Sequence, residues 1–596
     1  METNTLTHNE VPHHEMPHSD WTANGASQAS RHPAPTNCDN VREGREVVWT
    51  IAGSDSGGGA GIQADLLTIY DLGGHGCSVI TTLTAQSSVT VNGIEKVSDQ
   101  MLLAQLSTLL ADLPPKAIKI GLLADQAQLE MVASWLRSTL ALHPQLFVIL
   151  DPVMVATCGA DLVVGSKANI SVEDRLDFSP FNGLLSLITP NFSELSLINR
   201  KSITTEQEFV AAARCLGRAL NCSVLAKGGD VPSNANWAAT TASDLLVCRN
   251  VTGCSAYFEH GHFWLSSPRL HTINNHGSGC TLSSAIATFC AKGYVMHDAV
   301  VLAKAYINRG LEYSYAVGQG AGPLARTGIP SQLAAFPQVS VLSLSGHVDC
   351  DSRTSTDCKS TTDCKDRADN EQVSVFADSM LSFKKLNHDI GVYPVVNCLA
   401  TLESLLQSGA KTVQLRIKTV LNASDSVGDL SIEARVQTAI ALGRHYQAQV
   451  FINDHWQLAL KHGAFGIHLG QEDLFSADLA AIADAGIALG LSSHGFFEML
   501  LAHQWQPSYL ALGHIFPTPT KKMPSKPQGI VKLGHYVKVF GNHYPLVAIG
   551  GIAESNLESV KSTLVANIAV VRAIAAADVP SHAFLALSAK WGANVG

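Results

Sequence analysis

Short apolar segments alternate with helical sequence patterns in two long stretches of this chain, and this alternation constrains the possible fold more than any other feature. The first stretch spans residues 46–335 and the second spans residues 386–596. Alternating strand and helix patterns are typical of β-α-β units, in which helices cover a largely parallel sheet. We therefore predict an α/β protein with two large domains.

The composition of the 596 residues excludes several other classes of protein. Apolar residues make up 46% and charged residues 15%, which can bury a large core and excludes a wholly disordered chain. The net charge of −10 argues against a basic nucleic-acid-binding protein. No apolar run has the length of a membrane span, no secretory signal begins the sequence, and the 13 cysteines are scattered without a CxxC pair. We expect a cytoplasmic protein with reduced thiols.

Two polar segments flank the first domain. Residues 1–45 are rich in histidine, and we predict a disordered tail there, with metal binding as the alternative. The middle of residues 340–385 contains almost no large apolar side chain, so burial cannot offset the entropy lost on ordering. We predict a flexible linker, with a metal clip made of Cys350, Cys358 and Cys364 as the alternative.

The second stretch contains eight short strand candidates, with helical patterns between most of them. They span residues 392–397, 412–418, 449–454, 464–470, 487–493, 509–516, 545–551 and 567–571. Eight β/α steps within about 200 residues are typical of a compact TIM barrel. Polar and charged residues follow the apolar segments, which places them at the C-terminal rim of the barrel, where active sites of this fold lie.

Two glycine-rich segments in the first stretch are candidate phosphate-binding loops. Gly53–Gly61 lacks the spacing of a P-loop or a dinucleotide-binding loop, and an ordinary tight turn also explains it. His276–Leu282 opens an apolar helix, whose exposed backbone N–H groups can hold a developing phosphate. Cys280 lies in the same field, which favours a thiolate able to take a proton from a substrate hydroxyl. A glycine-capped helix with a buried cysteine is the alternative.

The first stretch contains seven motifs, which in chain order are AGSDSGGGAGIQADL, CSVITTLTAQ, KIGLL, LDPVMVATCG, ITPNFSE, KGG and HGSGCTLSSAIA. Together they resemble those of hydroxymethylpyrimidine/phosphomethylpyrimidine kinase, a ribokinase-like family of thiamine biosynthesis. The resemblance covers residues 46–330 and implies a ribokinase-like α/β/α domain. It also implies phosphorylation of the pyrimidine alcohol and then of its monophosphate, with ATP as co-substrate and Mg²⁺ as cofactor.

The resemblance implies that Gly53, Asp65 and Gln86 contact the aminopyrimidine. The Gln86 amide suits this task because it offers both a donor and an acceptor to a ring nitrogen and an exocyclic amine. Two positions depart from the family pattern, since Ser278 replaces a commoner threonine and Gly57 a commoner serine. Both exchanges keep a small residue and should preserve the backbone of the loops.

The resemblance further implies that Cys280 is the catalytic residue and that Gly277 and Gly279 frame the anion hole. Asp151 falls at a strand end and could position Mg²⁺ or phosphate. Lys227 is expected near the nucleotide. For Asp151 and Lys227 a structural ion pair is the alternative.

A strand of the second stretch presents two cations on one face. Residues Gln414, Arg416 and Lys418 share a face because side chains alternate along a strand, and the residues between them are apolar. Two cations that point into a barrel mouth indicate a polyanionic ligand. A solvated edge strand is the alternative.

Oxygen ligands and a second phosphate site follow from the neighbouring strand ends. Asp454 and Asp473 follow adjacent strand candidates and offer the carboxylate oxygens that Mg²⁺ prefers. The segment Pro517–Lys521 supplies two hydroxyls and a cation after the sixth strand. Gly550 and Gly551 follow the seventh strand, where this fold commonly binds phosphate through exposed backbone amides.

The second stretch contains the motifs YPVVN, QLRIK, FINDHW, GIHLGQEDL, LGLSSH, ALGHIFPTPTK and VAIGGI. They resemble those of thiamine-phosphate synthase, and the resemblance covers residues 389–590. The resemblance implies that hydroxymethylpyrimidine pyrophosphate and a thiazole phosphate are joined to give thiamine phosphate and pyrophosphate. It also implies a dissociative mechanism, in which pyrophosphate departs first and the thiazole nitrogen traps the pyrimidine cation.

This resemblance assigns site residues in the barrel. It implies that the pyrimidine pyrophosphate is bound by Gln414, Arg416, Lys418, Asn453, Ser492 and Lys521, the thiazole phosphate by Thr518, Thr520, Gly551, Val571 and Arg572, and Mg²⁺ by Asp454 and Asp473. The family usually has serine where this chain has Arg572, which either adds phosphate affinity or blocks the pocket. A ring nitrogen needs no general base as a nucleophile, so we predict structural roles for His468, His494 and His514.

Together the two resemblances imply a bifunctional enzyme whose first domain makes the substrate of the second. Two alternatives remain: a kinase that acts on pyridoxal, and a barrel that is a thiazole tautomerase or a non-catalytic sensor of thiamine intermediates. We expect small-molecule substrates as partners, without nucleic acid or membrane, and the sequence is compatible with a homo-oligomer.

Overall fold

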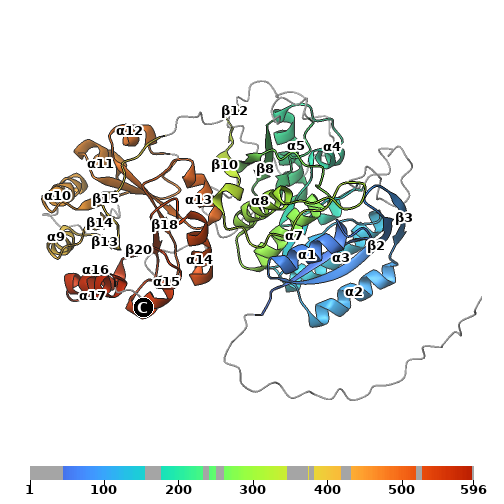
Figure 1. Ribbon diagram of the computed structural model, residues 1–596, viewed down its shortest axis with the longest axis horizontal. Coiled ribbons are helices and arrows are strands. Elements are labelled where there is room, and N and C mark those ends of the chain that lie inside the picture. Colours follow the sequence, from blue (N-terminus) through green and yellow to red (C-terminus); the bar gives the residue numbers. More distant parts are fainter. Residues whose placement is uncertain are drawn as a thin grey trace, which may run out of the picture. The chain divides into compact units, whose positions relative to one another are not determined.

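The computed structural model describes residues 44–154, 176–232, 240–249, 261–344, 373–374, 381–417, 431–474, 476–518 and 526–592 (Figure 1). Most of the predicted tail and linker lies outside these residues. Residues Arg45–Gly596 form one compact unit.

The first domain is built on a ten-stranded sheet in the order β10-β9-β8-β7-β6-β5-β4-β1-β2-β3. Its strands are β1 (Val47–Asp55), β2 (His75–Gln86), β3 (Val91–Lys96), β4 (Ala117–Ile120), β5 (Phe147–Leu150), β6 (Leu187–Ile188), β7 (Ser223–Ala226), β8 (Thr241–Val247), β9 (His262–Pro268) and β10 (Gln338–Val341). Pairing is parallel from β7 to β2, which confirms the predicted α/β class. Strands β3 and β8 to β10, toward the two ends of the sheet, pair antiparallel.

Helices cover both faces of this sheet. They are α1 (Gly61–Asp71), α2 (Asp99–Asp112), α3 (Gln126–Leu142), α4 (Phe192–Asn199), α5 (Glu206–Leu220), α7 (Ser278–Ala291) and α8 (Met296–Glu312). Successive residues of β1 face opposite ways, as the pleat requires. Val48 belongs to the apolar cluster of α1, α7 and α8, whereas Trp49 belongs to the cluster of α2 to α5. The domain therefore has the three-layer α/β/α arrangement that was predicted.

The second domain is a closed barrel of eight parallel strands, as predicted. The strands are β13 (Val392–Val396), β14 (Thr412–Leu415), β15 (Gln449–Asn453), β16 (Gly466–Leu469), β17 (Ala488–Ser493), β18 (Tyr509–Leu512), β19 (Leu546–Ile549) and β20 (Asn567–Val570). Each of the eight sequence segments contains one of these strands. Because all strands run the same way, the residues that follow them meet at one rim of the barrel.

Helices surround the barrel between its strands (Figure 1). They are α9 (Leu399–Gln407), α10 (Ile432–His445), α11 (Trp456–His462), α12 (Leu479–Asp484), α13 (Phe496–His503), α14 (Gly529–Phe540), α15 (Leu557–Lys561), α16 (Arg572–Ala575) and α17 (Pro580–Gly592). A separate apolar cluster fills the barrel interior and includes Tyr393, Phe451 and Tyr509. The barrel is thus a packed core whose open rim carries the loops.

The two domains pack against each other through α13. This barrel helix contacts α8 and β10 of the first domain. The backbone N–H of Phe497 donates to Asp298 Oδ1 at 2.8 Å. The rings of Phe263 and Phe497 meet edge to face, with 4.9 Å between centroids. Buried contacts between the domains therefore accompany the covalent connection.

The domain boundaries stay predictions, and β10 crosses the predicted start of the linker at residue 340. Strands β11 (Ser343–Leu344) and β12 (Val373–Ser374) pair antiparallel beyond it. Among the residues described above, none of the helices combines the length and the apolar character that a transmembrane helix requires.

Candidate active sites

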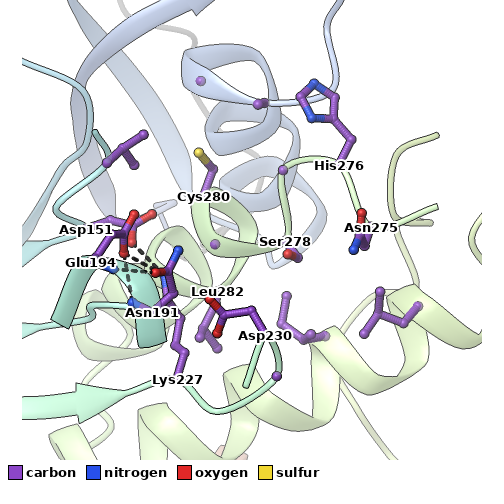
Figure 2. Close-up of a pocket in the computed structure, with 18 of the residues that line it drawn as sticks. Asp151, Asn191, Glu194, Lys227, Asp230, Asn275, His276, Ser278, Cys280 and Leu282 are labelled. Carbon is purple, nitrogen blue, oxygen red and sulfur yellow. Dashed lines mark hydrogen bonds and ion pairs between the residues drawn. The ribbon is translucent and has the colours of Figure 1, made fainter. Parts of the chain in front are cut away.

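A cavity of about 790 Å³ opens at the carboxyl ends of the parallel strands in the first domain (Figure 2). Ligands of open α/β sheets bind at this edge, because loops rather than helices cover it. Seven of the eight kinase-site residues predicted from the sequence line the cavity. They are Gly53, Gln86, Asp151, Lys227, Gly277, Gly279 and Cys280.

An ion pair lies at the inner end of the cavity. Lys227 Nζ is 2.9 Å from Asp151 Oδ1 and 3.9 Å from Glu194 Oε2. Thr189 Oγ1 donates to the same Asp151 oxygen at 3.1 Å. Burial alone would lower the pKa of Lys227, but Asp151 and then Glu194 hold it above its usual value. The ammonium therefore stays charged and can face an anionic ligand.

Glu194 is a site residue that sequence reasoning missed. It lines the cavity, and Figure 2 shows it with Asp151, Asn191 and Lys227 beside the first turn of α7. Its Oε2 accepts the Asn191 backbone N–H at 2.8 Å in a capping box that begins α4. Burial raises the pKa of Glu194 to about 7, although Lys227 opposes the shift. The spacing Asn191-x-x-Glu194 was the local signal that could have identified it.

Asp55 organises the first glycine-rich loop. Its Oδ1 accepts the Gly57 N–H at 2.8 Å, and its Oδ2 accepts the N–H groups of Gly59 at 3.1 Å and Ala60 at 2.8 Å. His276 Nε2 lies 3.1 Å from the same Oδ2. This carboxylate therefore connects the glycine-rich loop to the residue that begins the second loop, which the sequence did not reveal.

Two glycines at the N-terminus of α7 shape the second glycine-rich loop, which begins at His276. Gly277 has φ +73°, and a Cβ there would lie 2.0 Å from the Gly59 carbonyl oxygen. A Cβ on Gly279 would lie 3.2 Å from Lys227 Nζ and 3.3 Å from Asp151 Oδ2. Glycine thus lets the start of the helix approach both the first loop and the ion pair, as an anion-binding helix N-terminus requires.

Cys280 lies in this first turn, where burial opposes the predicted thiolate. Burial raises the pKa of the Cys280 thiol to about 11, and the nearby Lys119 only partly counters it. Desolvation is the largest contribution to this rise, because a charged sulfur loses its hydration when it is buried. The group is therefore a neutral thiol at physiological pH.

Asp65 is the one predicted kinase residue that does not line the cavity. Its side chain is fully buried and pairs with Lys119 Nζ at 2.8 Å. Thr50 and Ser284 donate hydroxyl hydrogens to the carboxylate, both at 2.6 Å. Lys119 does line the cavity. Asp65 thus holds a buried lysine behind the site, and its direct contact with a substrate stays a prediction.

The barrel rim brings several of the predicted synthase residues together. Gln414 lies in β14, Arg416 directly after it, Asn453 at the end of β15 and Ser492 in β17. Asn453 is paired in register with His468 of β16. Burial, and to a smaller extent the positive charge of Arg416, lowers the pKa of His468 to about 3, so this imidazole is neutral. A ring with so low a pKa is a weak base, which agrees with the prediction that His468 is not a general base.

The two predicted metal ligands follow neighbouring strands. Asp454 has φ +62°, and its backbone N–H donates to the His468 carbonyl of β16 at 3.1 Å. Asp473 Oδ2 accepts the Gly470 N–H at 3.2 Å, which holds the carboxylate in the turn after β16. The residues described above contain no group of three or more histidine, cysteine or acidic side chains placed to hold a metal. A pair of carboxylates fits Mg²⁺ that is also bound by substrate phosphates.

The loops after β18 and β19 approach each other closely. Gly550 has φ +100° and Gly551 has φ +69°. A Cβ on Gly551 would lie 2.8 Å from the Pro517 carbonyl oxygen, next to Thr518 in the chain. The geometry thus places Thr518 beside the glycine pair, as a shared phosphate site would need.

The remaining predicted barrel residues are only partly described. Val571 caps the N-terminus of α16 after β20, and Arg572 is exposed at its first position. Lys418, Thr520 and Lys521 lie outside the described residues. Their roles in binding stay predictions.

Family models match both domains. One that is described as phosphomethylpyrimidine kinase matches residues 55–325, and one described as thiamine monophosphate synthase matches residues 392–574. The barrel is 52% identical over 196 residues to a thiamine-phosphate synthase of Yersinia pestis, covering 33% of this chain and 87% of the relative. It is 48% identical over 205 residues to a thiamine-phosphate synthase of Citrobacter koseri, covering 34% of this chain and 93% of the relative.

Solved structures are similar to the first domain. The pyridoxal kinase from Staphylococcus aureus in complex with AMP-PCP and pyridoxal has 22% identity and a TM-score of 0.40, covering 50% of this chain and 100% of that chain. The phosphomethylpyrimidine kinase from Clostridium difficile 630 has 29% identity and a TM-score of 0.32, covering 44% of this chain and 98% of that chain. The first domain matches the family model of phosphomethylpyrimidine kinase, and through its barrel the chain belongs to the thiamine-phosphate synthase family.

Proposed function

We propose that this chain catalyses consecutive steps of thiamine biosynthesis. The first domain phosphorylates hydroxymethylpyrimidine and then its monophosphate with ATP. The barrel joins the resulting pyrophosphate to a thiazole phosphate and releases pyrophosphate. The observation that carries this proposal is the presence of both families in one chain, since the product of one is the substrate of the other.

In the kinase domain, the first turn of α7 and Lys227 stabilise the transferred phosphoryl group. Backbone N–H groups at a helix N-terminus and a buried ammonium both favour developing negative charge. Gln86 lines the cavity where it can bind the pyrimidine ring. Cys280 holds the substrate hydroxyl near these donors as a neutral thiol, because its pKa is raised to about 11.

Magnesium fits both sites by the chemistry of the side chains present. Asp151 and Glu194 face the kinase cavity, and Asp454 and Asp473 follow adjacent barrel strands. Carboxylate oxygens are the ligands that Mg²⁺ prefers, with phosphate oxygens completing its shell. A bound Mg²⁺ would stabilise negative charge on the phosphate groups.

In the barrel, Arg416 and the predicted ligands Lys418 and Lys521 bind the pyrophosphate group of the pyrimidine substrate. Cations aimed at the leaving group favour departure, because charge grows there as the bond breaks. Thr518 and Gly551 bind the phosphate of the thiazole. We propose that backbone amides of the turn at Val571 and the exposed Arg572 contact the same phosphate.

The alternatives have less specific support. The family model of the first domain is described as phosphomethylpyrimidine kinase, and relatives of the barrel at 48% and 52% identity are named synthases. Neither finding favours a tautomerase or a sensor.

The proposal is tested with the purified full-length chain, hydroxymethylpyrimidine, ATP, Mg²⁺ and thiazole phosphate. We expect thiamine phosphate as the product, and hydroxymethylpyrimidine should be phosphorylated faster than pyridoxal. Phosphorylation of pyridoxal at an equal or higher rate would refute the kinase assignment. Pyrimidine pyrophosphate that accumulates without thiamine phosphate would refute the synthase assignment.

A further inference from the structure

Five side chains inside the barrel form an unbroken chain of hydrogen bonds, which we call the Tyr–His chain. Gln414 Nε2 is 3.3 Å from Tyr393 Oη, which is 3.0 Å from Tyr509 Oη. Tyr509 Oη is 2.7 Å from His468 Nδ1, and His468 Nε2 is 2.8 Å from Ser492 Oγ. The chain connects β14, β13, β18, β16 and β17, and it ends at a residue that we place in the synthase site.

Burial leaves these groups no water to bind. Tyr509 is 0% exposed, Tyr393 1%, Gln414 4% and His468 6%. The hydroxyls of Tyr393 and Tyr509 and the Nδ1 of His468 therefore depend on partners within the chain, since an unpaired buried donor costs free energy. The chemistry of each group then decides which neighbour donates.

The amide nitrogen of Gln414 sets the direction of the chain because it can only donate. Tyr393 Oη accepts this hydrogen and must direct its own O–H to Tyr509, whose O–H then reaches His468 Nδ1. The neutral imidazole carries its one hydrogen on Nε2 and donates it to Ser492 Oγ. In the reverse direction, the Tyr393 O–H would point at the Gln414 N–H. One of these two buried donors would then have no acceptor.

The direction of the hydrogen bonds in the Tyr–His chain determines whether the Ser492 hydroxyl can donate. Because Ser492 Oγ accepts from His468, its own hydroxyl hydrogen is not used by the chain. The main chain of Ser492 is also held, since Gln471 Nε2 donates to its carbonyl oxygen at 2.7 Å. Its hydroxyl is thus fixed in place and oriented as a donor before substrate binds.

We propose that the Tyr–His chain is a positioning device that presents the Ser492 hydroxyl as a hydrogen-bond donor to an acceptor atom of the pyrimidine pyrophosphate. This inference rests on the proposed synthase function. Tyr393, Tyr509 and His468 are positioning residues, because they act on the substrate only through Ser492. No proton leaves the chain during the reaction.

The test replaces Tyr509 by phenylalanine in the full-length chain, which keeps the ring and removes the hydroxyl. Without the Tyr509 hydroxyl, His468 Nδ1 loses its partner, and the hydrogen that faces Ser492 is no longer fixed on Nε2. We expect kcat/KM for pyrimidine pyrophosphate to fall about ten- to a hundredfold, the loss of one hydrogen bond to a charged group. KM for thiazole phosphate should stay unchanged, as should kinase activity.

Tyr544→Phe is the matched control. Tyr544 Oη lies 2.6 Å from His503 Nδ1 outside the barrel interior, so this variant removes the same kind of tyrosine–histidine bond. It should retain wild-type kcat/KM. Equal losses in Tyr509→Phe and Tyr544→Phe would overturn the proposal.

A double-mutant cycle separates positioning from general destabilisation. In a Ser492→Ala background, Tyr509→Phe should cause little further loss, because the group that it orients is absent. Full additivity of the two losses would overturn the proposal. Should Tyr509→Phe fail to fold, Tyr393→Phe is used in the same cycle with the same expectation. Synthase turnover of the wild type separates failure of this proposal from failure of the proposed function. An inactive wild type would refute the synthase function itself.

Discussion

At the scale of single residues, two opposite effects set the protonation of Cys280. Burial raises its pKa to about 11, and Lys119 lowers it by less. Lys119 is itself fixed by Asp65, so the cation cannot move toward the sulfur without breaking a buried ion pair. A substrate hydroxyl in this cavity therefore meets a neutral thiol next to the N–H groups of α7.

We predict that iodoacetamide modifies Cys280 slowly at pH 7 and that the rate rises throughout the range from pH 7 to pH 9. The thiolate fraction grows about tenfold per pH unit below the pKa, and the thiolate is the reactive form. Peptide mass spectrometry over a pH series measures this rate. The exposed Cys215 and Cys398 serve as accessible reference thiols. A rate that levels off between pH 7 and pH 8 would indicate a thiolate and contradict the assignment.

At the scale of elements, the loop between β1 and α1 depends on one carboxylate. Burial alone would raise the pKa of Asp55, but His276 and the backbone N–H groups of Ala60 and Gly57 hold it below its usual value. The ionised form is therefore favoured by folding. Its contribution to stability is present above the unfolded pKa near 4 and is lost as the pH falls through the lower folded pKa.

We predict that Asp55→Asn lowers the free energy of unfolding by about 1–3 kcal/mol at pH 7, because the amide cannot accept all the N–H groups that the carboxylate accepts. The difference from the wild type should shrink at pH 3. Thermal unfolding at both pH values measures it, and kinase kcat/KM should fall as well. Asp478→Asn is the control, since asparagine caps α12 equally well. An equal effect of both variants would argue against the role of Asp55.

Some strands and site residues could be predicted from the sequence, and others could not. The eight barrel strands were predictable because each is a short apolar segment that ends in polar or glycine residues. Strands β3 and β8 to β10, toward the two ends of the sheet, were missed, since polar residues interrupt the apolar pattern of each. The predicted site residues largely meet at one cavity and one rim. Lys119 and the Tyr–His chain were not foreseen, because their roles arise from contacts between strands far apart in sequence. The role of Asp55 was missed because its local turn contacts and its contact with His276 appear only in the folded loop.

At the scale of the whole molecule, the kinase domain supports a helix of the barrel. Asp298 of α8 accepts the backbone N–H of Phe497 in the first turn of α13. A Cβ on Gly495 would lie 2.1 Å from an Asp298 oxygen, so glycine lets the two domains approach. The helix that the kinase domain caps follows β17, the strand that carries Ser492.

We predict that Asp298→Ala lowers the midpoint temperature of unfolding of the full-length chain, because the buried N–H of Phe497 loses its acceptor at a cost of about 1–3 kcal/mol. Asp298→Asn keeps an acceptor oxygen and should unfold at a temperature closer to that of the wild type. Differential scanning calorimetry compares the three proteins. Identical midpoints for the alanine and asparagine variants would show that the contact contributes nothing.

The central claim is that one chain carries two active sites that work in sequence, and mixing two full-length variants tests it most directly. Lys227→Ala should block the kinase step, because it removes the ammonium that stabilises the transferred phosphoryl group, and Asp473→Ala should block the synthase step. Neither variant alone should convert hydroxymethylpyrimidine, ATP and thiazole phosphate into thiamine phosphate. We predict that an equimolar mixture restores product formation and that Lys227→Ala alone remains active on supplied pyrimidine pyrophosphate. Full turnover by either variant alone, or an inactive mixture of folded proteins, would contradict it.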